Sequence, residues 1–113
     1  MTWRTDIESE FEKANRARLA GNEGQARVCA RRAAGIAARE YFLRRGSPVR
    51  TPSAYEVLQA VAADADVPAR VRVASAWLTR RVDEEFKLPP DVDLVAEARA
   101  FCEGLLPGWL ESP

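Results

Sequence analysis

Histidine is absent from this 113-residue sequence, and lysine occurs only at Lys13 and Lys87. The lack of imidazole excludes catalysis by a histidine base and the common zinc sites that use histidine. No GxSxG, Walker, GxGxxG or CxxC motif is present, so the short signatures of hydrolases, nucleotide-binding loops and redox sites are missing too. The residues left for chemistry are carboxylates, arginines, tyrosines and two cysteines, and we expect no cofactor and no metal.

Long apolar runs are also lacking. None approaches the ~20 residues that spanning a bilayer requires, and Met1 to Arg4 lead into a polar segment without the apolar core of a signal peptide. Cys29 and Cys102 both fall on apolar helical stripes, which predicts buried free thiols rather than a disulfide. These features predict a cytoplasmic protein without membrane contact.

An excess of one charge is the third absence, because 17 Lys+Arg balance 17 Asp+Glu. No overall field therefore draws the chain toward nucleic acid or membrane. A hydrophobic content of 47% with 30% charged residues is ordinary for a globular protein, and the length predicts one domain, residues 1–113.

Capping residues and a three-to-four-residue apolar rhythm predict an all-α fold, and strand-like alternation is missing from the sequence. Five helices are predicted from residues that favour a helix start or a helix end. They run from Thr5 to Gly21, from Asn22 to Gly46, from Ser53 to Asp64, from Pro68 to Phe86, and from Asp91 or Asp93 to Pro107. The short break at Gly21 predicts an antiparallel hairpin of the first two helices. The expected architecture is an up-and-down bundle of four main helices plus a short one.

The second predicted helix has one broad apolar face made mostly of alanine. At about 100° per residue, that face contains Ala26, Cys29, Ala30, Ala33, Ile36, Ala37, Tyr41 and Leu43. Such small side chains let another helix approach closely, so we interpret the face as core rather than as a dimer seam. Glu40 and Arg44 fall inside the same arc, one turn apart. Either they line a polar pocket or a dimer seam, or they pair with each other at the end of the bundle.

The sequence of residues 31–46, RRAAGIAAREYFLRRG, resembles the second-helix signature of HEPN domains in its alanines, its aromatic and aliphatic pair and its closing Arg-Gly. Gly35-Ile36 departs from the family, which usually has Glu-Lys there. The similarity extends to Trp3, to TPSAYEVL at 51–58, to WLTRR at 77–81 and to LPPD at 88–91. The resemblance therefore covers nearly the whole chain.

The resemblance implies an up-and-down helical bundle that is usually dimeric. Some HEPN members are ribonucleases, often toxins, in which an arginine is followed four to six residues later by a histidine. Others lack that pair and act as nucleotide-binding or interaction modules, including partners of minimal nucleotidyltransferases. Here Arg80 and Arg81 lie near the expected place, but the sequence EEFK at 84–87 occupies the histidine positions. The resemblance thus implies a non-catalytic member.

Three residues are candidate ligand or RNA contacts: Arg80, Arg81 and Glu85. Because Arg81 and Glu85 are one turn apart, Arg81 either contacts a phosphate and is held by Glu85, or the two form only a structural ion pair. Arg32, together with the Glu40 and Arg44 pair, is a candidate for an interface or pocket.

The other arginines of the second helix, Arg27 and Arg31 among them, are spread around it and are interpreted as a solvated, interacting surface rather than a nucleic-acid stripe. Balanced charge further weakens electrostatic binding of RNA.

The sequence favours a non-catalytic HEPN-like homodimer that acts as a nucleotide-binding or protein-interaction module, with a minimal nucleotidyltransferase as the expected partner. One alternative is a ribonuclease with a histidine-free site, in which Arg81 stabilises the phosphorane and Glu85 or Glu84 acts as base. The other alternative is a purely structural dimeric helical protein.

Overall fold

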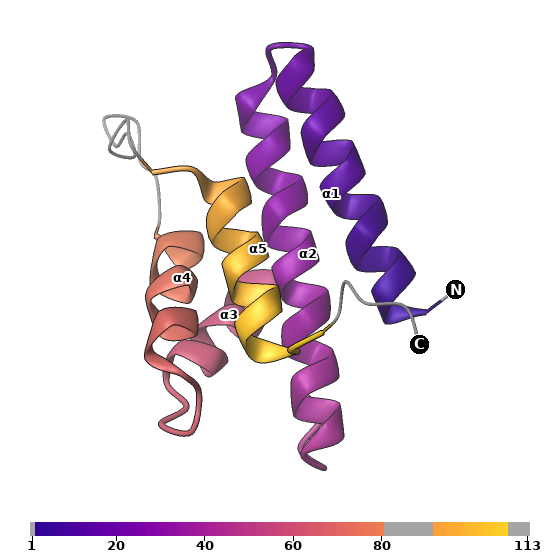
Figure 1. Ribbon diagram of the computed structural model, residues 1–113. Helices are drawn as coiled ribbons and strands as arrows, with labels where there is room; N and C mark the ends of the chain where they lie inside the picture. The colour runs from indigo at the N-terminus through magenta and orange to yellow at the C-terminus, as the bar shows by residue number, and fades with distance from the viewer. Residues whose placement is uncertain (1, 81–91, 109–113) are drawn as a thin grey trace.

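The computed structural model describes residues 2–80 and 92–108, and these residues form five helices and no strand. The helices are α1 Trp3–Leu19, α2 Glu23–Arg44, α3 Ala54–Ala62, α4 Ala69–Thr79 and α5 Leu94–Leu105. Figure 1 shows α1 and α2 as an antiparallel hairpin. α5 runs along α2 in the same direction, and α4, on the far side of α5, runs in the opposite direction. The all-α prediction is confirmed for the described residues.

Three helix starts follow the predicted capping chemistry. The side chain of Asn22 accepts the backbone N–H of Gln25 at 3.1 Å, and that of Ser53 accepts the N–H of Glu56 at 3.2 Å. Asp93 caps α5 in the same way. Each side chain satisfies an N–H group that has no partner inside its own helix.

Two predicted helix boundaries were wrong. α1 begins before Thr5, because Thr2 is the cap and its hydroxyl accepts the backbone N–H of Thr5 at 3.2 Å. α4 was predicted to run to Phe86 but ends at Thr79, since Arg80 is extended with φ −65° and ψ 119°. Residues 81–86 of the predicted helix lie outside the described residues. The hydroxyl of Thr79 donates to the carbonyl of Ser75 at 2.8 Å, a local bond of the kind that competes with helix continuation.

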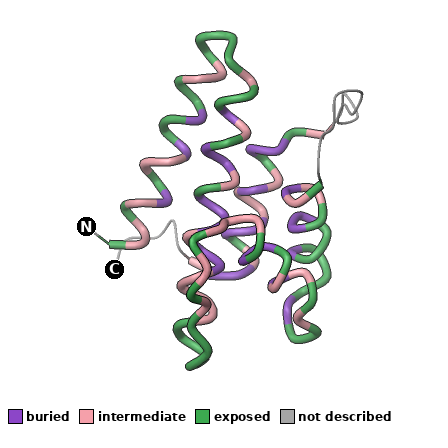
Figure 2. The backbone as a smooth tube through the Cα atoms, turned by 180° about the vertical axis from the view of Figure 1, so that it is seen from behind, coloured by how far each residue is buried: buried purple, intermediate pink, exposed green. Residues whose placement is uncertain are grey.

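α2 is the central helix, with α1, α3 and α5 packed around it. Its six alanines are fully buried: Ala26, Ala30, Ala33, Ala34, Ala37 and Ala38. Figure 2 shows buried segments on α2 and on the helices packed around it. The alanine face is therefore core, as predicted. Burial extends further around the helix than predicted because α3 packs on the flank at Gly35, where an added Cβ would lie 3.1 Å from the Cβ of Ala54.

Leu43 was predicted to lie on the buried face but is 59% exposed. The last turn of α2 extends past the ends of the neighbouring described helices (Figure 1), which agrees with the exposure of this side chain. Both cysteines, in contrast, are buried free thiols, as predicted.

A single guanidinium ties three helix ends together. Arg18, at the end of α1, donates to both carboxylate oxygens of Glu23 at 2.9 and 2.7 Å. It also donates to both oxygens of Asp93 at 3.1 and 3.0 Å. These hydrogen bonds lower the pKa of each carboxyl below its ordinary value. The start of α5 is thereby held against the tip of the α1–α2 hairpin.

We expect Arg18→Ala to lower the free energy of unfolding by about 1 kcal/mol at neutral pH, because the three groups are partly exposed and screened by water. A carboxyl with a lowered folded-state pKa stabilises the fold above its ordinary pKa and loses that contribution as the pH falls through the folded value. The difference between wild type and variant should therefore shrink as the pH drops below 4.5 and 3.8, the ordinary values for Glu23 and Asp93.

Urea unfolding at a series of pH values measures this difference. Arg16→Ala is the matched control, since Arg16 is exposed in the same last turn of α1 and has no ion-pair partner among the described residues. A difference that stays constant down to pH of about 2 would contradict the role of the two carboxylates.

Candidate functional site

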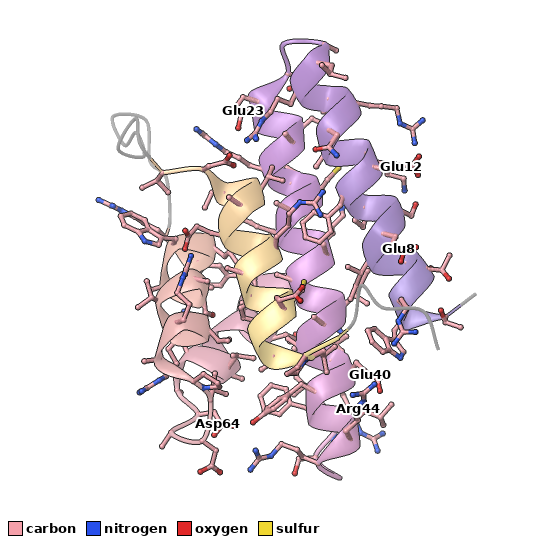
Figure 3. All side chains as sticks on the ribbon, in the orientation of Figure 1. Glu8, Glu12, Glu23, Glu40, Arg44 and Asp64 are labelled. Carbon is pink, nitrogen blue, oxygen red and sulfur yellow. The ribbon has the colours of Figure 1, made fainter. Side chains whose placement is uncertain are left out.

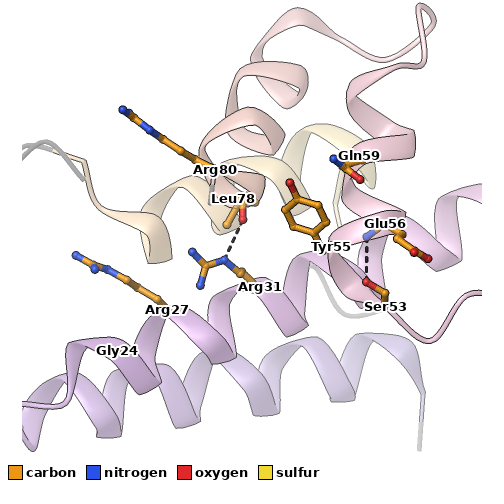
Figure 4. Close-up of a pocket in the computed structure, with 9 residues that line it drawn as sticks. All are labelled: Gly24, Arg27, Arg31, Ser53, Tyr55, Glu56, Gln59, Leu78 and Arg80. Atoms are coloured by element: carbon orange, nitrogen blue, oxygen red, sulfur yellow. Dashed lines mark hydrogen bonds between the residues drawn. The ribbon is translucent and has the colours of Figure 1, made fainter. Parts of the chain in front are cut away.

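A cavity of about 730 Å³ opens between the first half of α2, the start of α3 and the end of α4 (Figure 4). Its lining contains three arginines and one carboxylate. The full lining is Gly24, Arg27, Arg31, Ser53, Tyr55, Glu56, Gln59, Leu78 and Arg80. The cavity is therefore positively charged, although the chain as a whole is neutral.

Two local features build the walls of this cavity. The close approach of Ala54 to Gly35 sets the start of α3 against α2, so that Tyr55 faces the arginines of α2. The end of α4 at Thr79 leaves the carbonyl of Leu78 without the N–H that another helical turn would supply. The side chain of Arg31 reaches that carbonyl and donates to it from Nε at 2.9 Å (Figure 4).

Arg31 is half-buried, and the Leu78 carbonyl is its hydrogen-bond partner. Burial lowers the pKa of this guanidinium, and the neighbouring charge of Arg27 lowers it further. An arginine nevertheless keeps its charge at neutral pH. Within the part of the chain that the structure describes, no carboxylate pairs with Arg31. The charge is thus partly desolvated, and no carboxylate among the described residues neutralises it.

Arg27 lies one turn before Arg31 on the same side of α2. Its Nε is buried and makes no hydrogen bond, although it lies 4.0 Å from a carboxylate oxygen of Glu23. At that distance the contact is an ion pair and not a hydrogen bond. Glu23 is already engaged by both hydrogen bonds from Arg18. Arg27 therefore adds positive charge to the cavity with only weak compensation.

The remaining wall combines a third cation with polar and aromatic groups. The guanidinium of Arg80 lies over the ring of Trp77, 5.4 Å from its centre. Glu56, the single acidic residue of the lining, accepts a hydrogen bond from the hydroxyl of Thr51. The carboxylate is thus held at the α3 side of the cavity, where it does not pair with the arginines of α2.

The candidate residues predicted from the sequence do not lie together in the structure. Arg80 lines the cavity, whereas Arg32 is exposed on α2 and does not. Glu40 and Arg44 lie at the opposite end of α2 from Glu23, as Figure 3 shows.

There Arg44 donates from Nε to Glu40 at 2.9 Å and its guanidinium lies 5.1 Å from the centre of the Trp3 ring. Their mutual pairing is therefore observed, and they do not line the cavity. Whether the pair also serves a dimer seam stays a prediction.

Arg81 and Glu85, the other two candidate ligand contacts, lie outside the described residues, as does Glu84. The ion pair between Arg81 and Glu85 and the histidine-free ribonuclease site built from them therefore stay predictions. The interpretation of Arg31 as solvated surface was wrong, because the early end of α4 gives its side chain a carbonyl to bury against.

The chemistry that this cavity supports is the binding of an anion. Guanidinium groups present paired donors that match phosphate and carboxylate oxygens. Within residues 2–80 and 92–108, no cluster of three His, Cys, Asp or Glu side chains could hold a metal ion. Burial raises the pKa of the Cys102 thiol to about 12, so this thiol stays protonated and is not a nucleophile.

Comparisons with protein families, with curated proteins and with solved structures found no match to the chain. Among the helices described above, none is long and apolar enough to cross a membrane. A functional assignment therefore rests on the geometry of the cavity and on the residues that resemble a known family.

We expect Arg31→Met to change the free energy of unfolding by less than about 1 kcal/mol. The variant loses a charged hydrogen bond to Leu78, but it also removes a half-buried charge that has no opposite partner. Leu78→Ala, which leaves a cavity at a fully buried position next to Arg31, should instead lower the free energy of unfolding by about 2–5 kcal/mol. Urea unfolding of both variants measures this contrast. A loss for Arg31→Met as large as that for Leu78→Ala would mean that Arg31 is mainly a structural residue.

Proposed function

We propose that this chain is a non-catalytic, HEPN-like helical bundle that binds a nucleotide through its phosphate groups in the arginine-lined cavity. The observation that carries the proposal is the half-buried charge of Arg31, which has no carboxylate partner among the described residues and lies beside Arg27. Keeping an uncompensated charge partly out of water costs free energy. A bound anion would supply the missing opposite charge.

The shape and lining of the cavity fit a nucleotide. Its volume of about 730 Å³ falls within the range of ~300–1,000 Å³ that is usual for small-molecule sites. Arg27 and Arg31 offer donors for phosphate oxygens on the α2 wall. Tyr55 and Gln59, on the α3 wall, offer an aromatic ring and an amide that suit a base.

The helical arrangement supports the HEPN-like part of the proposal. An alanine-rich second helix forms a hairpin with α1, α5 packs along α2, and α4, packed on α3 and α5, runs in the direction opposite to α5 (Figure 1). The homodimer and the nucleotidyltransferase partner belong to the same proposal and rest on the resemblance of the residues alone. The cavity is proposed as a binding site and not an active site, because its carboxylate is held by Thr51 and its other charged groups are arginines.

Thermal unfolding with ATP, inorganic triphosphate, adenosine and a short RNA tests this function. At about 100 times the Kd, a ligand should stabilise the fold by ~2.7 kcal/mol, which corresponds to a rise in Tm of roughly 10 °C. We expect ATP and triphosphate to stabilise the wild type and adenosine to have little effect. Arg31→Met should abolish the shift, and Arg16→Ala should keep it. A shift that survives in Arg31→Met, or no shift with any phosphate compound, would refute the proposal.

A further inference from the structure

The outward side of α4 is partly apolar, and it shares only Arg80 with the cavity described above. At about 100° per residue, the buried side chains Val71, Ala74, Ser75 and Leu78 fall on one side of α4. A second set falls on the opposite side, and we call it the outer α4 face: Ala69, Arg72, Val73, Ala76, Trp77 and Arg80. Figure 1 shows no other described helix against this side of α4. A helix that is apolar on two opposite sides is usually covered on both.

Several apolar side chains of the outer α4 face are exposed to solvent, as expected for an uncovered contact surface. Val73 is 51% exposed, although it is a large aliphatic residue. Ala69 and Ala76 are exposed beside it, and Trp77, at the flank of this face, is partly exposed and partly packed against the core. Alanines next to a larger side chain let a second helix approach closely, with Val73 filling the groove between its side chains.

The charges on this face are all positive. α4 contains no Asp or Glu. Arg70 is neutralised by both carboxylate oxygens of Glu97, each at 2.9 Å. Arg72 is exposed, and within the described residues it has no ion-pair partner. Arg80 adds a guanidinium two turns further along the same side, stacked on Trp77.

We propose that the outer α4 face docks an amphipathic helix of a partner protein, with acidic residues beside the partner's apolar stripe. Carboxylates on that helix would meet Arg72, while its apolar side chains would cover Val73 and Trp77. A second copy of this chain fits poorly through the same face, since two α4 helices would bring their Arg72 side chains together and α4 itself contains no Asp or Glu. This inference does not rest on the proposed nucleotide site, which the face meets only at Arg80.

The test uses a displayed library of amphipathic helical peptides that vary in flanking charge. The library is panned against the folded wild-type protein, and the binders are re-measured by fluorescence anisotropy. We expect acidic-flanked peptides to be enriched. Their affinity should fall by roughly tenfold or more in Val73→Ser and in Arg72→Glu. Peptides with lysine in place of the acidic flanks should regain binding to Arg72→Glu.

Two control variants separate this face from other surfaces. Leu43→Ser removes an equally exposed aliphatic side chain at the far end of α2 and should leave peptide binding unchanged. Arg31→Met should also leave it unchanged, so failure of the nucleotide site and failure of the docking face can be told apart. Far-UV circular dichroism and Tm establish that each variant is folded.

Three outcomes would overturn the proposal. The library yields no enriched peptides, the enriched peptides show no preference for acidic flanks, or their affinity does not change in Val73→Ser and Arg72→Glu. Self-association of the wild type that Val73→Ser abolishes would assign the face to a second copy. Binding of short RNA or of phosphatidylserine vesicles that depends on Val73 and Arg72, in place of peptide binding, would assign it to those ligands.

Discussion

Close packing around a helix of small residues is the constraint on which the rest of this structure depends. Six alanines and Gly35 on α2 are buried, and three other helices pack around them. A larger side chain at Gly35 would push α3 away, since even a Cβ would stand 3.1 Å from that of Ala54. Because α3 carries one wall of the cavity and α2 the other, the width of the cavity follows from the size of these residues.

The charges of the molecule fall into two groups with different physical roles. Around Arg18, one guanidinium is in hydrogen-bond contact with two carboxylates, and these contacts hold helix ends together. Arg31 has no carboxylate in ion-pair contact among the described residues, and burial makes that arrangement costly. Stability alone would favour an apolar residue at such a position. The anion site proposed above supplies a reason for a charge there.

Local sequence signals were sufficient for much of the fold. Asn22, Ser53 and Asp93 were recognisable as caps because a cap depends only on residues within one helical turn. The alanine face was recognisable from its spacing. Thr2 and Thr5 were ambiguous since both are good capping residues one turn apart, and only the structure shows that Thr2 accepts the N–H of Thr5. The exposure of Leu43 depends on where the neighbouring helices end. The sequence of α2 alone contains no information about those helix ends.

The candidate site was harder to predict for the same reason. Arg31 becomes a site residue through a carbonyl 47 positions later in the chain, and the end of α4 exposes that carbonyl. The spacing of Arg27 and Arg31, one turn apart beside the alanine face, was the available signal. Periodicity places both side chains on α2 but does not show which one another helix covers. Arg80 was recognisable because the WLTRR segment resembles a known motif.

The proposed anion site is tested most directly by the response of the arginine side chains to triphosphate, followed through their Nε–H resonances by NMR. We predict saturable shifts for Arg31 and Arg27, while Arg16 and Arg18 stay unchanged. If the Arg31 resonance does not move, or if all arginines shift together without saturation, the cavity is not the anion site and the charge of Arg31 has another cause.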